Sequence, residues 1–357
     1  TLKSLCELDY DKKQLEIIVV DDGSTDNTVT IAKQFAAKHP SYDIKVLRKE
    51  NGGKHTALNL AIKHARGEFF GALDADSFVD KKALRRIMKF FEDKEVAAVT
   101  PSMKVYKPKG FWQRIQAMEY LMGIFLRKAF AELGSIHVTP GPFSIYRITF
   151  FEENGVYREA HLTEDIEMAL RAQRAHKTIE NSVDAYVYTV APDNHRLLFK
   201  QRLRWYIGFL KNVMDYKDLF SKKHGNLGMF ILPSSFFSVA LVITFISYFA
   251  ILQIDNLIRT YTNFAAINFD FSQLQLFNFE LFFINISAPA ILGFIALAVS
   301  VSVIVYAKKL SKEKTSIFKS YVFFALFYWL FFGFWWVVSA FKVFVTKKGV
   351  GWGHKSE

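Results

Sequence analysis

The sequence predicts an α/β domain over about its first 200 residues, followed by a helical membrane region. Two observations predict this division. In the first part, short β-branched runs alternate with stretches of helical spacing, which is typical of a sheet covered by helices. The second part holds 24 of the 37 phenylalanines, counted from Phe209 onward. With a hydrophobic fraction of 51% overall, this uneven distribution favours burial in a membrane.

The first hundred residues contain four predicted strands separated by helices. The strands are residues 16–20, 44–48, 68–73 and 96–100. One predicted helix ends at His39, and the other two cover residues 56–65 and 81–91. Such alternation predicts a parallel sheet with covering helices. Ligands of these sheets bind beyond the carboxyl ends of the strands, so polar motifs at those ends are the first candidates for a site.

Two acidic motifs follow predicted strands at that edge. Asp21 and Asp22 open the run DDGS after the first strand, and Asp74 and Asp76 belong to the run DAD after the third. Two carboxylates separated by one residue can converge on one hard divalent cation that also bridges diphosphate oxygens. Either motif alone is equally compatible with ordinary turn chemistry.

The run NGGK between these motifs strengthens the interpretation of both. Gly52 and Gly53 allow close backbone approach, and Lys54 supplies a cation suited to a phosphate group. A P-loop ATPase is disfavoured, because the chain has no GxxxxGK[ST] pattern.

Two later motifs combine acidic or basic groups with helices. Glu164 and Asp165, in the run TED, open a predicted helix over residues 166–175. This acidic pair is either a helix cap that complements the dipole or a carboxylate that takes a proton from a hydroxyl nucleophile. The run QRLRW, residues 201–205, offers arginines for a diphosphate and an indole that can stack on a sugar ring. Its alternative is a basic amphipathic helix at a membrane surface.

Composition excludes several other classes of site. Cys6 is the only cysteine, which excludes a disulfide framework and a thiolate zinc cluster. The nine histidines show no HExxH spacing. The net charge of +12 results from 46 Lys and Arg against 34 Asp and Glu. Because the positive charge concentrates beside apolar runs, it favours a membrane surface over nucleic acid.

Three long apolar runs predict membrane-spanning helices. Residues 229–252 and 282–307 carry no charge, and residues 321–345 carry only Lys342. About 20 apolar residues suffice to cross a bilayer as a helix. We therefore expect three spans, in preference to three buried helices of a large soluble core.

Lysine placement predicts the orientation of these runs. The loop between the second and third runs carries five lysines against one glutamate, whereas the loop before the second run is acidic. The positive-inside rule places the lysine loop, and with it the first domain, in the cytoplasm. Three spans would then leave the basic tail at Lys347 and Lys348 outside. Either one run is re-entrant or interfacial, or the tail is external, and we favour the former.

The five motifs DDGS, NGGK, DAD, TED and QRLRW, in this order and followed by apolar runs, resemble those of the membrane-bound family 2 glycosyltransferases. The resemblance extends over roughly residues 16–210 and is to the hyaluronan, chitin, cellulose and poly-N-acetylglucosamine synthases. It implies a GT-A fold, Rossmann-like with a mixed sheet, for residues 1–196. It further implies a QxxRW interface segment at 197–228 and a transmembrane region with about three spans and a basic tail at 229–357.

Family members begin this domain with a strand that has no counterpart here, so we expect one nucleotide-contacting strand and any earlier span to be missing from the sequence. The family also has helices that lie in the membrane interface. This implies such helices at residues 111–131 and 197–210.

The resemblance assigns roles to the motif residues. The residues around the nucleotide are then Asp21, Asp22, Lys54, Asp74, Gln201, Arg202 and Arg204. A divalent metal, Mg²⁺ or Mn²⁺, is assigned to Asp76. Asp165 is the implied general base, with Glu164 beside it among the catalytic residues, and Trp205 contacts the acceptor.

Two other segments resemble the family less completely. The loop with Gly141, Pro142 and Phe143 resembles an acceptor-side loop, although glycine and proline alone indicate only a turn. The C-terminal runs FVTKKG and WGH resemble nucleotide-gating motifs, which implies gating by Thr346, Lys348 and Trp352. The alternative is a basic end of the last span that snorkels to the interface.

The expected activity is inverting transfer of a sugar from UDP-GlcNAc or UDP-glucose to a growing β-linked polysaccharide. Its alternative is transfer of a single sugar to a lipid acceptor. A non-catalytic membrane protein on this fold is disfavoured, because the motifs are intact. Expected partners are the UDP-sugar, the polysaccharide or lipid acceptor, membrane lipid and secretion accessory proteins, with no nucleic acid. We expect an integral protein of the plasma membrane with a cytoplasmic catalytic domain.

Overall fold

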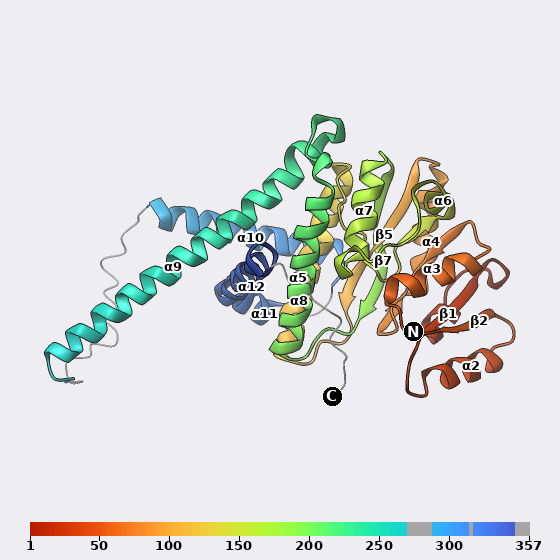
Figure 1. Cartoon of the computed structure of the whole chain (residues 1–357), viewed down its shortest axis with the longest axis horizontal. Coiled ribbons are helices and arrows are strands. Elements are labelled where there is room, and N and C mark those ends of the chain that lie inside the picture. The colour runs from red at the N-terminus through yellow and green to blue at the C-terminus, as the bar shows by residue number, and fades with distance from the viewer. Residues whose placement is uncertain (270–287, 314–316, 347–357) are drawn as a thin grey trace.

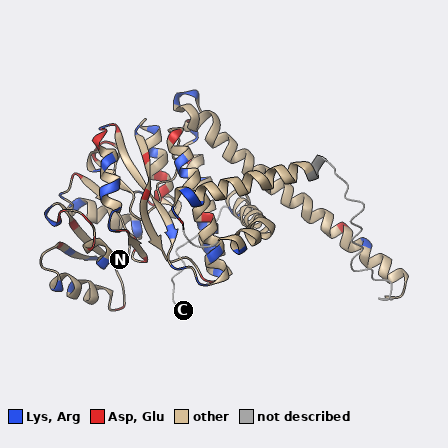
Figure 2. Cartoon of the chain, turned by 180° about the vertical axis from the view of Figure 1, so that it is seen from behind, with Lys and Arg blue, Asp and Glu red and all other residues tan. Residues whose placement is uncertain are grey.

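The computed structural model describes residues 1–269, 288–313 and 317–346. Figure 1 shows an α/β body from which two long helices, α9 (Leu232–Ala266) and α10 (Ala288–Leu310), extend to one side. In Figure 2, Lys, Arg, Asp and Glu are distributed over the body, whereas α9 and α10 are almost free of them. The chain thus has the two parts that the sequence predicts.

A two-stranded parallel sheet lies at the N-terminal side of the body, after the short helix α1 (Leu2–Cys6). β1 (Glu16–Asp22) pairs with β2 (Asp43–Lys49), and α2 (Thr28–Lys38) connects them. The β-branched residues of β1 suit a half-buried pleated surface. The register sets Asp21 opposite Arg48 and Asp22 opposite Lys49. Each carboxylate of DDGS therefore faces a cation at the carboxyl end of the sheet.

The central sheet has five strands in the order β3-β6-β5-β7-β4. β5 (Val96–Val105) and β7 (Thr178–Thr189) are parallel. β6 (Ile145–Arg147) is antiparallel to β3 (Phe69–Gly71) and β5, and β4 (Ser77–Val79) is antiparallel to β7. This mixed sheet confirms the fold class implied by the family resemblance.

The parallel sheet predicted from alternation alone is wrong, and the connection after β3 explains why. Residues 72–76, which include DAD, lead directly into β4 at the opposite edge of the sheet. The alternation rule assumes a helical crossover between neighbouring strands, and no helix intervenes here. DAD consequently reaches the carboxyl end of β7, where the Val190 amide donates to the Asp76 carbonyl oxygen at 3.4 Å.

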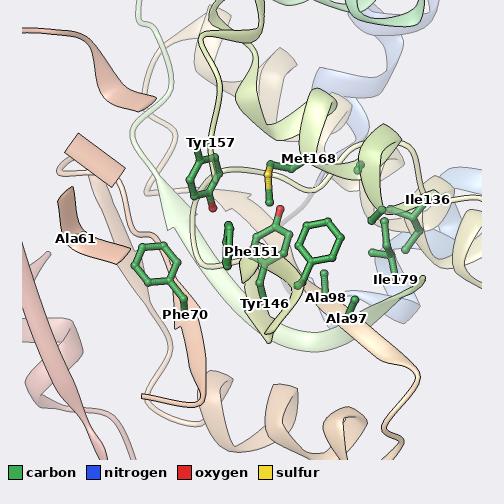
Figure 3. Packing of buried hydrophobic residues seen from close by; sticks show 13 residues of the cluster. Ala61, Phe70, Ala97, Ala98, Ile136, Tyr146, Phe151, Tyr157, Met168 and Ile179 are labelled. Atoms are coloured by element: carbon green, nitrogen blue, oxygen red, sulfur yellow. The ribbon is translucent and has the colours of Figure 1, made fainter. Parts of the chain in front are cut away.

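Helices cover the sheets and build the core. They are α3 (Lys54–His64), α4 (Ala83–Met88), α6 (Ile148–Asn154) and α7 (Glu164–Arg174). Figure 3 shows Phe70, Tyr146, Phe151 and Tyr157 packed with Met168 of α7, which is fully buried. Each large apolar side chain buried in this way contributes about 1.5–3 kcal/mol. The start of α7, which carries TED, is thereby fixed against the sheet.

Two longer helices lie between this body and the apolar helices. α5 (Phe111–Glu132) and α8 (His195–Asp215) contain the two predicted interface segments. α8 begins two residues earlier than predicted, because the side chain of Asn194 accepts a hydrogen bond from the Leu197 amide at 3.0 Å. Such a cap satisfies one of the free amides of a helix start.

Three helical stretches are long and apolar enough to cross a membrane, as the sequence predicts: Leu227–Ala266, Ile291–Leu310 and Phe318–Thr346. Residues 282–287 of the predicted second run lie outside the described residues. The loop after α10 lies against the body, because Lys104 of β5 donates to the Ser311 carbonyl oxygen at 2.8 Å and pairs with Glu313 at 3.3 Å. The α/β body and this loop are therefore at the same end of α10.

The third apolar stretch differs from the other two in its surroundings. It contains α11 (Phe318–Phe323) and α12 (Trp329–Phe341), and α12 packs along α8, where Trp336 stacks on Tyr206 with ring centroids 4.2 Å apart. Phe323 contacts Phe111 at the start of α5. In Figure 1, α12 is seen nearly end-on, whereas α9 and α10 run across the view. This stretch packs against α8 and α5 and also against α9, since Trp329 of α12 contacts Phe245 and Phe249 of α9.

Candidate functional site

The DDGS and NGGK loops form one joined structure. The Asp22 carboxylate accepts a hydrogen bond from the Gly52 amide at 3.1 Å and pairs with Lys49 at 2.7 Å. Gly23 has φ +83°, and a Cβ atom there would lie 2.8 Å from the Asn51 nitrogen. This close approach in a left-handed conformation requires glycine.

Asp21 lies deeper in the same junction. Its carboxylate is buried, accepts from the Ser24 amide at 3.3 Å and pairs with Arg48 at 3.4 Å. A hollow in the surface beside it is lined by Gly23, Arg48, Lys49, Glu50 and Asn51. Backbone amides and cations around such a hollow can receive the polar edge of a nucleotide.

Lys54 connects this junction to the other two acidic motifs. Its Nζ atom lies 2.8 Å from Oδ1 of Asp74 and 2.8 Å from Oε1 of Glu164. Burial alone would lower the pKa of Lys54, but these two carboxylates raise it above its usual range. Gly141 borders the same group, since a Cβ atom there would lie 3.1 Å from Nζ. The cation thus joins α3, the DAD turn and the start of α7.

The DAD turn presents two carboxylates with different surroundings. The Ser77 amide donates to the Asp74 carbonyl oxygen at 3.0 Å, which closes a turn around Ala75. Asp74 is engaged by Lys54, whereas Asp76 is exposed and accepts only from the Ser77 hydroxyl, at 3.0 Å, among the described side chains. No cluster of three or more His, Cys, Asp or Glu side chains in the described ranges could hold a metal unaided.

This donor set suits a Mg²⁺ or Mn²⁺ ion whose coordination is completed by a ligand and water. It does not suit a cation that only protein atoms coordinate. Mg²⁺ is commonly bound by one or two carboxylates and completed by phosphate oxygens and water. Asp76 provides a hard, exposed oxygen donor, and Asp74 lies two residues away. A metal at this turn would therefore depend on oxygen atoms from a bound ligand.

Asp165 lies at the first turn of α7, next to Lys54 and Glu164. Burial, followed by the negative charge of Glu164, raises the pKa of Asp165 to about 6, although Lys54, the Ile166 amide and Arg204 act in the opposite direction. The Asp165 carboxylate borders a small pocket that also includes Gly141 and Tyr146. A carboxyl group with a pKa near neutrality in a cleft is a candidate general base.

The backbone of Asp165 is held from the opposite side by two residues for which no role was predicted. Thr139 donates to the Asp165 carbonyl oxygen through both its amide, at 3.1 Å, and its hydroxyl, at 2.8 Å. The Tyr146 hydroxyl donates to Thr139 Oγ1 at 2.6 Å. These contacts join residues far apart in sequence, so no local pattern could have identified them.

The QRLRW motif divides between two faces of α8. Arg204 is half-buried and lies close enough to Asp165 to favour its ionised form. Arg202, in contrast, is fully buried, forms an ion pair with Glu119 of α5 and donates to Gln201 Oε1 at 2.9 Å. Its guanidinium also lies 4.2 Å from the Trp205 ring. The predicted nucleotide contact of Arg202 is therefore corrected to a packing contact between α5 and α8.

The acceptor-side loop also differs from its prediction. Gly141 lies beside Lys54 and Asp74, but the Phe143 ring is buried in a hydrophobic cluster with Val99 and Ile145. Pro142 is buried as well. Phe143 is therefore a core residue rather than a contact for an acceptor, because its side chain points into the sheet instead of the pocket.

The predicted gating residues are only partly described. Thr346 ends the third apolar stretch, where its hydroxyl donates to the Lys342 carbonyl oxygen at 3.0 Å. Lys348 and Trp352 lie outside the described residues.

Comparisons with known proteins identify relatives of this chain. Residues 1–155 match the family described as Glycosyl transferase family 2. The poly-beta-1,6-N-acetyl-D-glucosamine synthase of Staphylococcus epidermidis is 30% identical over 291 residues, which cover 80% of this chain and 68% of that protein. The beta-monoglucosyldiacylglycerol synthase of a Nostoc species is 29% identical over 248 residues, covering 65% of this chain and 53% of that protein.

Among solved structures, a mannosyltransferase from Pyrobaculum calidifontis in complex with GDP-Man and Mn²⁺ is similar in fold. It has a TM-score of 0.57 and 18% identity, covering 97% of this chain and 83% of that chain. At this level of identity the likeness concerns the fold, and it includes the helical part as well as the body.

The two arginines of QRLRW offer a matched test of their different surroundings. We expect Arg202→Met to lower the melting temperature, because it leaves Glu119 without its buried partner, a change that typically costs about 3–5 kcal/mol. Nucleotide affinity should remain near that of the unmodified protein. Arg204→Met should show the reverse pattern. Thermal unfolding and nucleotide titration in detergent measure both, and an equal loss of affinity in Arg202→Met would contradict the correction.

Proposed function

Because this chain belongs to glycosyl transferase family 2, we propose that it transfers a sugar from a UDP-sugar to a growing β-linked polysaccharide in the membrane. The observation that carries the proposal is the position of Lys54, 2.8 Å from both Asp74 and Glu164. This cation joins the motifs suited to a nucleotide diphosphate to the carboxyl group suited to activate a hydroxyl. One contiguous site therefore contains both halves of a transfer reaction.

The donor half of the proposal rests on the joined loops. Asp21 and Asp22 hold the uridine, and Lys54 and Asp74 lie where the diphosphate follows. The hollow beside Gly23 and the cations of β2 support this assignment. Similarity to a synthase of poly-N-acetyl-D-glucosamine favours UDP-GlcNAc as the donor, with UDP-glucose as the second choice.

Asp76 is the proposed protein ligand of Mg²⁺ or Mn²⁺. When bound, such a cation neutralises charge that develops on the diphosphate leaving group. Arg204 supplies further positive charge from α8, close enough to act on Asp165. Lys54 holds the carboxylates of Asp74 and Glu164 together through its two ion pairs.

In the proposed reaction, Asp165 accepts the proton of the acceptor hydroxyl. The acceptor oxygen then forms a bond to the anomeric carbon as the bond from that carbon to the UDP oxygen breaks. Attack from the face opposite UDP inverts the configuration, so an α-linked donor gives a β-linked product. General base catalysis of this kind typically contributes a factor of about 10²–10⁴.

Transfer of one sugar to a lipid remains the second candidate. The similarity to a monoglucosyldiacylglycerol synthase favours it, since that relative's name describes a glycolipid product. The two candidates share the donor site and base and differ in the acceptor. Size and solubility of the product distinguish them.

The orientation is also a proposal. We infer that α9 and α10 cross the membrane and that α11 and α12 lie along its cytoplasmic interface with α5 and α8. The stacking of Trp336 on Tyr206 and the Lys104 contacts with the loop after α10 support this arrangement. It keeps the lysine loop and Thr346 on the side of the catalytic domain, in agreement with the positive-inside rule.

The product test uses the full chain in lipid with Mn²⁺ or Mg²⁺ and a panel of radiolabelled UDP-sugars. We expect one donor to give a polymer that resists extraction into organic solvent. A single-sugar product that partitions into the solvent would establish the lipid acceptor instead. If no UDP-sugar gives a labelled polymer or a labelled lipid, transferase activity is contradicted.

The role of Asp165 predicts a specific effect of substitution and of pH. Asp165→Asn should reduce transfer at least 10²-fold, whereas UDP affinity should change little, because the donor motifs are intact. Glu152→Gln, on an exposed position of α6, is the control and should retain full activity. Retention of turnover in Asp165→Asn would exclude it as the base.

The pH dependence follows from the raised pKa. A base works in its ionised form, so kcat/KM should fall as the pH drops through about 6, the pKa of Asp165. Neutralising the neighbouring charge in Glu164→Gln should lower the pKa of Asp165 and move this acid limb to lower pH. An unchanged limb would show that another group controls it.

Single-cysteine variants on a Cys6→Ser background test the orientation. Thr346→Cys should react with a membrane-impermeant maleimide only after the cells are opened, as should Lys309→Cys in the lysine loop. Asn268→Cys, beyond the far end of α9, should react in intact cells. Labelling of Thr346→Cys in intact cells would instead indicate that the third stretch crosses the membrane.

A further inference from the structure

The turn before Glu164 and Asp165 has an unusual backbone. Ala160, His161 and Leu162 have φ values of +46°, +53° and +66°, and none is glycine. The left-handed region is unfavourable for residues with a Cβ atom and persists only where the surrounding structure imposes it. Contacts made by this turn should therefore explain its conformation.

Asn212 of α8 provides the main contacts. This side chain is 1% exposed, and its Nδ2 atom lies 3.0 Å from the Ala160 carbonyl oxygen and 2.8 Å from Thr163 Oγ1. On the outer side of the turn, Nε2 of His161 lies 2.8 Å from Oδ2 of Asp215, which is also on α8. One helix thus holds the turn at both ends and along its outer side.

Gly208 allows α8 to approach this closely. A Cβ atom at Gly208 would lie 2.1 Å from Thr163 Oγ1 and 2.4 Å from Thr163 Cγ2. Thr163 is at the N-cap position of α7, yet its hydroxyl makes no capping hydrogen bond to α7. It donates instead to the Ala160 carbonyl oxygen at 3.1 Å. Thr163 is therefore part of the contact with α8.

The same face of α8 carries Arg204. Residues 204, 208 and 212 are spaced by four and lie above one another on a helix. Arg204 lies near Asp165, and Gly208 and Asn212 contact the residues that precede Asp165. The distance between the cation and the carboxylate is therefore set within one rigid helix and the turn bound to it.

We propose that Asn212 and Gly208 are positioning residues, which fix Asp165 relative to Arg204 by holding the left-handed turn 160–162 against α8. The inference rests on the proposed function of Asp165 as the base. A displacement of about 1 Å in a catalytic group can cost about 10²-fold in rate. Among the described residues, the polar contacts of the turn 160–162 run to α8 and Thr163 and not to the DDGS and NGGK loops. We therefore expect the effect on donor binding to be small beside the effect on kcat.

The test compares Asn212→Leu with a matched control in the full chain. Leucine has the same four branched side-chain heavy atoms as asparagine, although it is bulkier, and it lacks the donors. Asn181 is 2% exposed and, within the central sheet, donates to the carbonyl oxygen and hydroxyl of Thr100, both at 3.1 Å. Asn181→Leu therefore removes an equivalent pair of hydrogen bonds without touching the turn. Both variants should lower the melting temperature.

Only Asn212→Leu should lower kcat, by about 10-fold to 10²-fold, with KM for the UDP-sugar and UDP affinity unchanged. Its acid limb should also move to lower pH, because a loosened turn admits water to Asp165. The charged and titratable groups that face Asp165 are Glu164, Lys54, Arg204, Tyr146 and Tyr157, and all remain in both variants. A change of stability alone would not move this limb.

Two further variants keep the proposal testable if Asn212→Leu does not fold. Asp215→Ala removes only the exposed contact with His161 and should give the same signature with a smaller fall in kcat. Gly208→Ala should resemble Asn212→Leu, because its methyl group displaces Thr163. Wild-type kcat and an unmoved acid limb in folded Asn212→Leu or Gly208→Ala would overturn the proposal.

Asp165→Asn separates this outcome from failure of the proposed function. If Asp165→Asn retains turnover, the assignment of the base is wrong. If it is inactive while folded Asn212→Leu behaves as wild type, the base stands and the positioning role is wrong.

Discussion

The bridge formed by Lys54 between Asp74 and Glu164 is the interaction on which the rest of the site depends. It connects three segments that the chain reaches by separate routes: the start of α3, the turn that crosses the end of the central sheet, and the start of α7. Without this cation, two carboxylates and the neighbouring Asp165 would repel one another at close range. With it, they form a compact acidic site beside a basic helix, which is the arrangement that a diphosphate leaving group and a hydroxyl nucleophile require.

The sequence predicted most of this arrangement, because the motifs lie at strand and helix ends. Lys54 meets Asp74 and Glu164, and Asp21 lies at the carboxyl end of β1 in the two-stranded sheet. What it could not predict depends on contacts between distant segments. Arg202 and Arg204 differ by two positions, and only the packing of α5 decides that one is buried with Glu119. The direction of the Phe143 ring and the support of Asp165 by Thr139 are of the same kind, and so is the mixed sheet, since the DAD connection contains no helix.

The membrane half shows a similar limit. Hydropathy identifies three stretches of sufficient length but not their direction relative to the body. The contacts of α12 with α8 and of Lys104 with Ser311 and Glu313 supply that information. α8 contacts the apolar helix α12 and also the turn that precedes Asp165, so one helix links the apolar region to the proposed reaction centre.

A double-substitution cycle of Lys54→Met and Glu164→Gln tests the central claim most directly. If Lys54 joins the donor site to the base through Glu164, removing either partner disrupts the same connection. The loss of kcat/KM in the doubly substituted protein should then be close to that of the more damaging single substitution. Losses that multiply, as expected for independent residues, would contradict the claim that this bridge unites the two halves of the site.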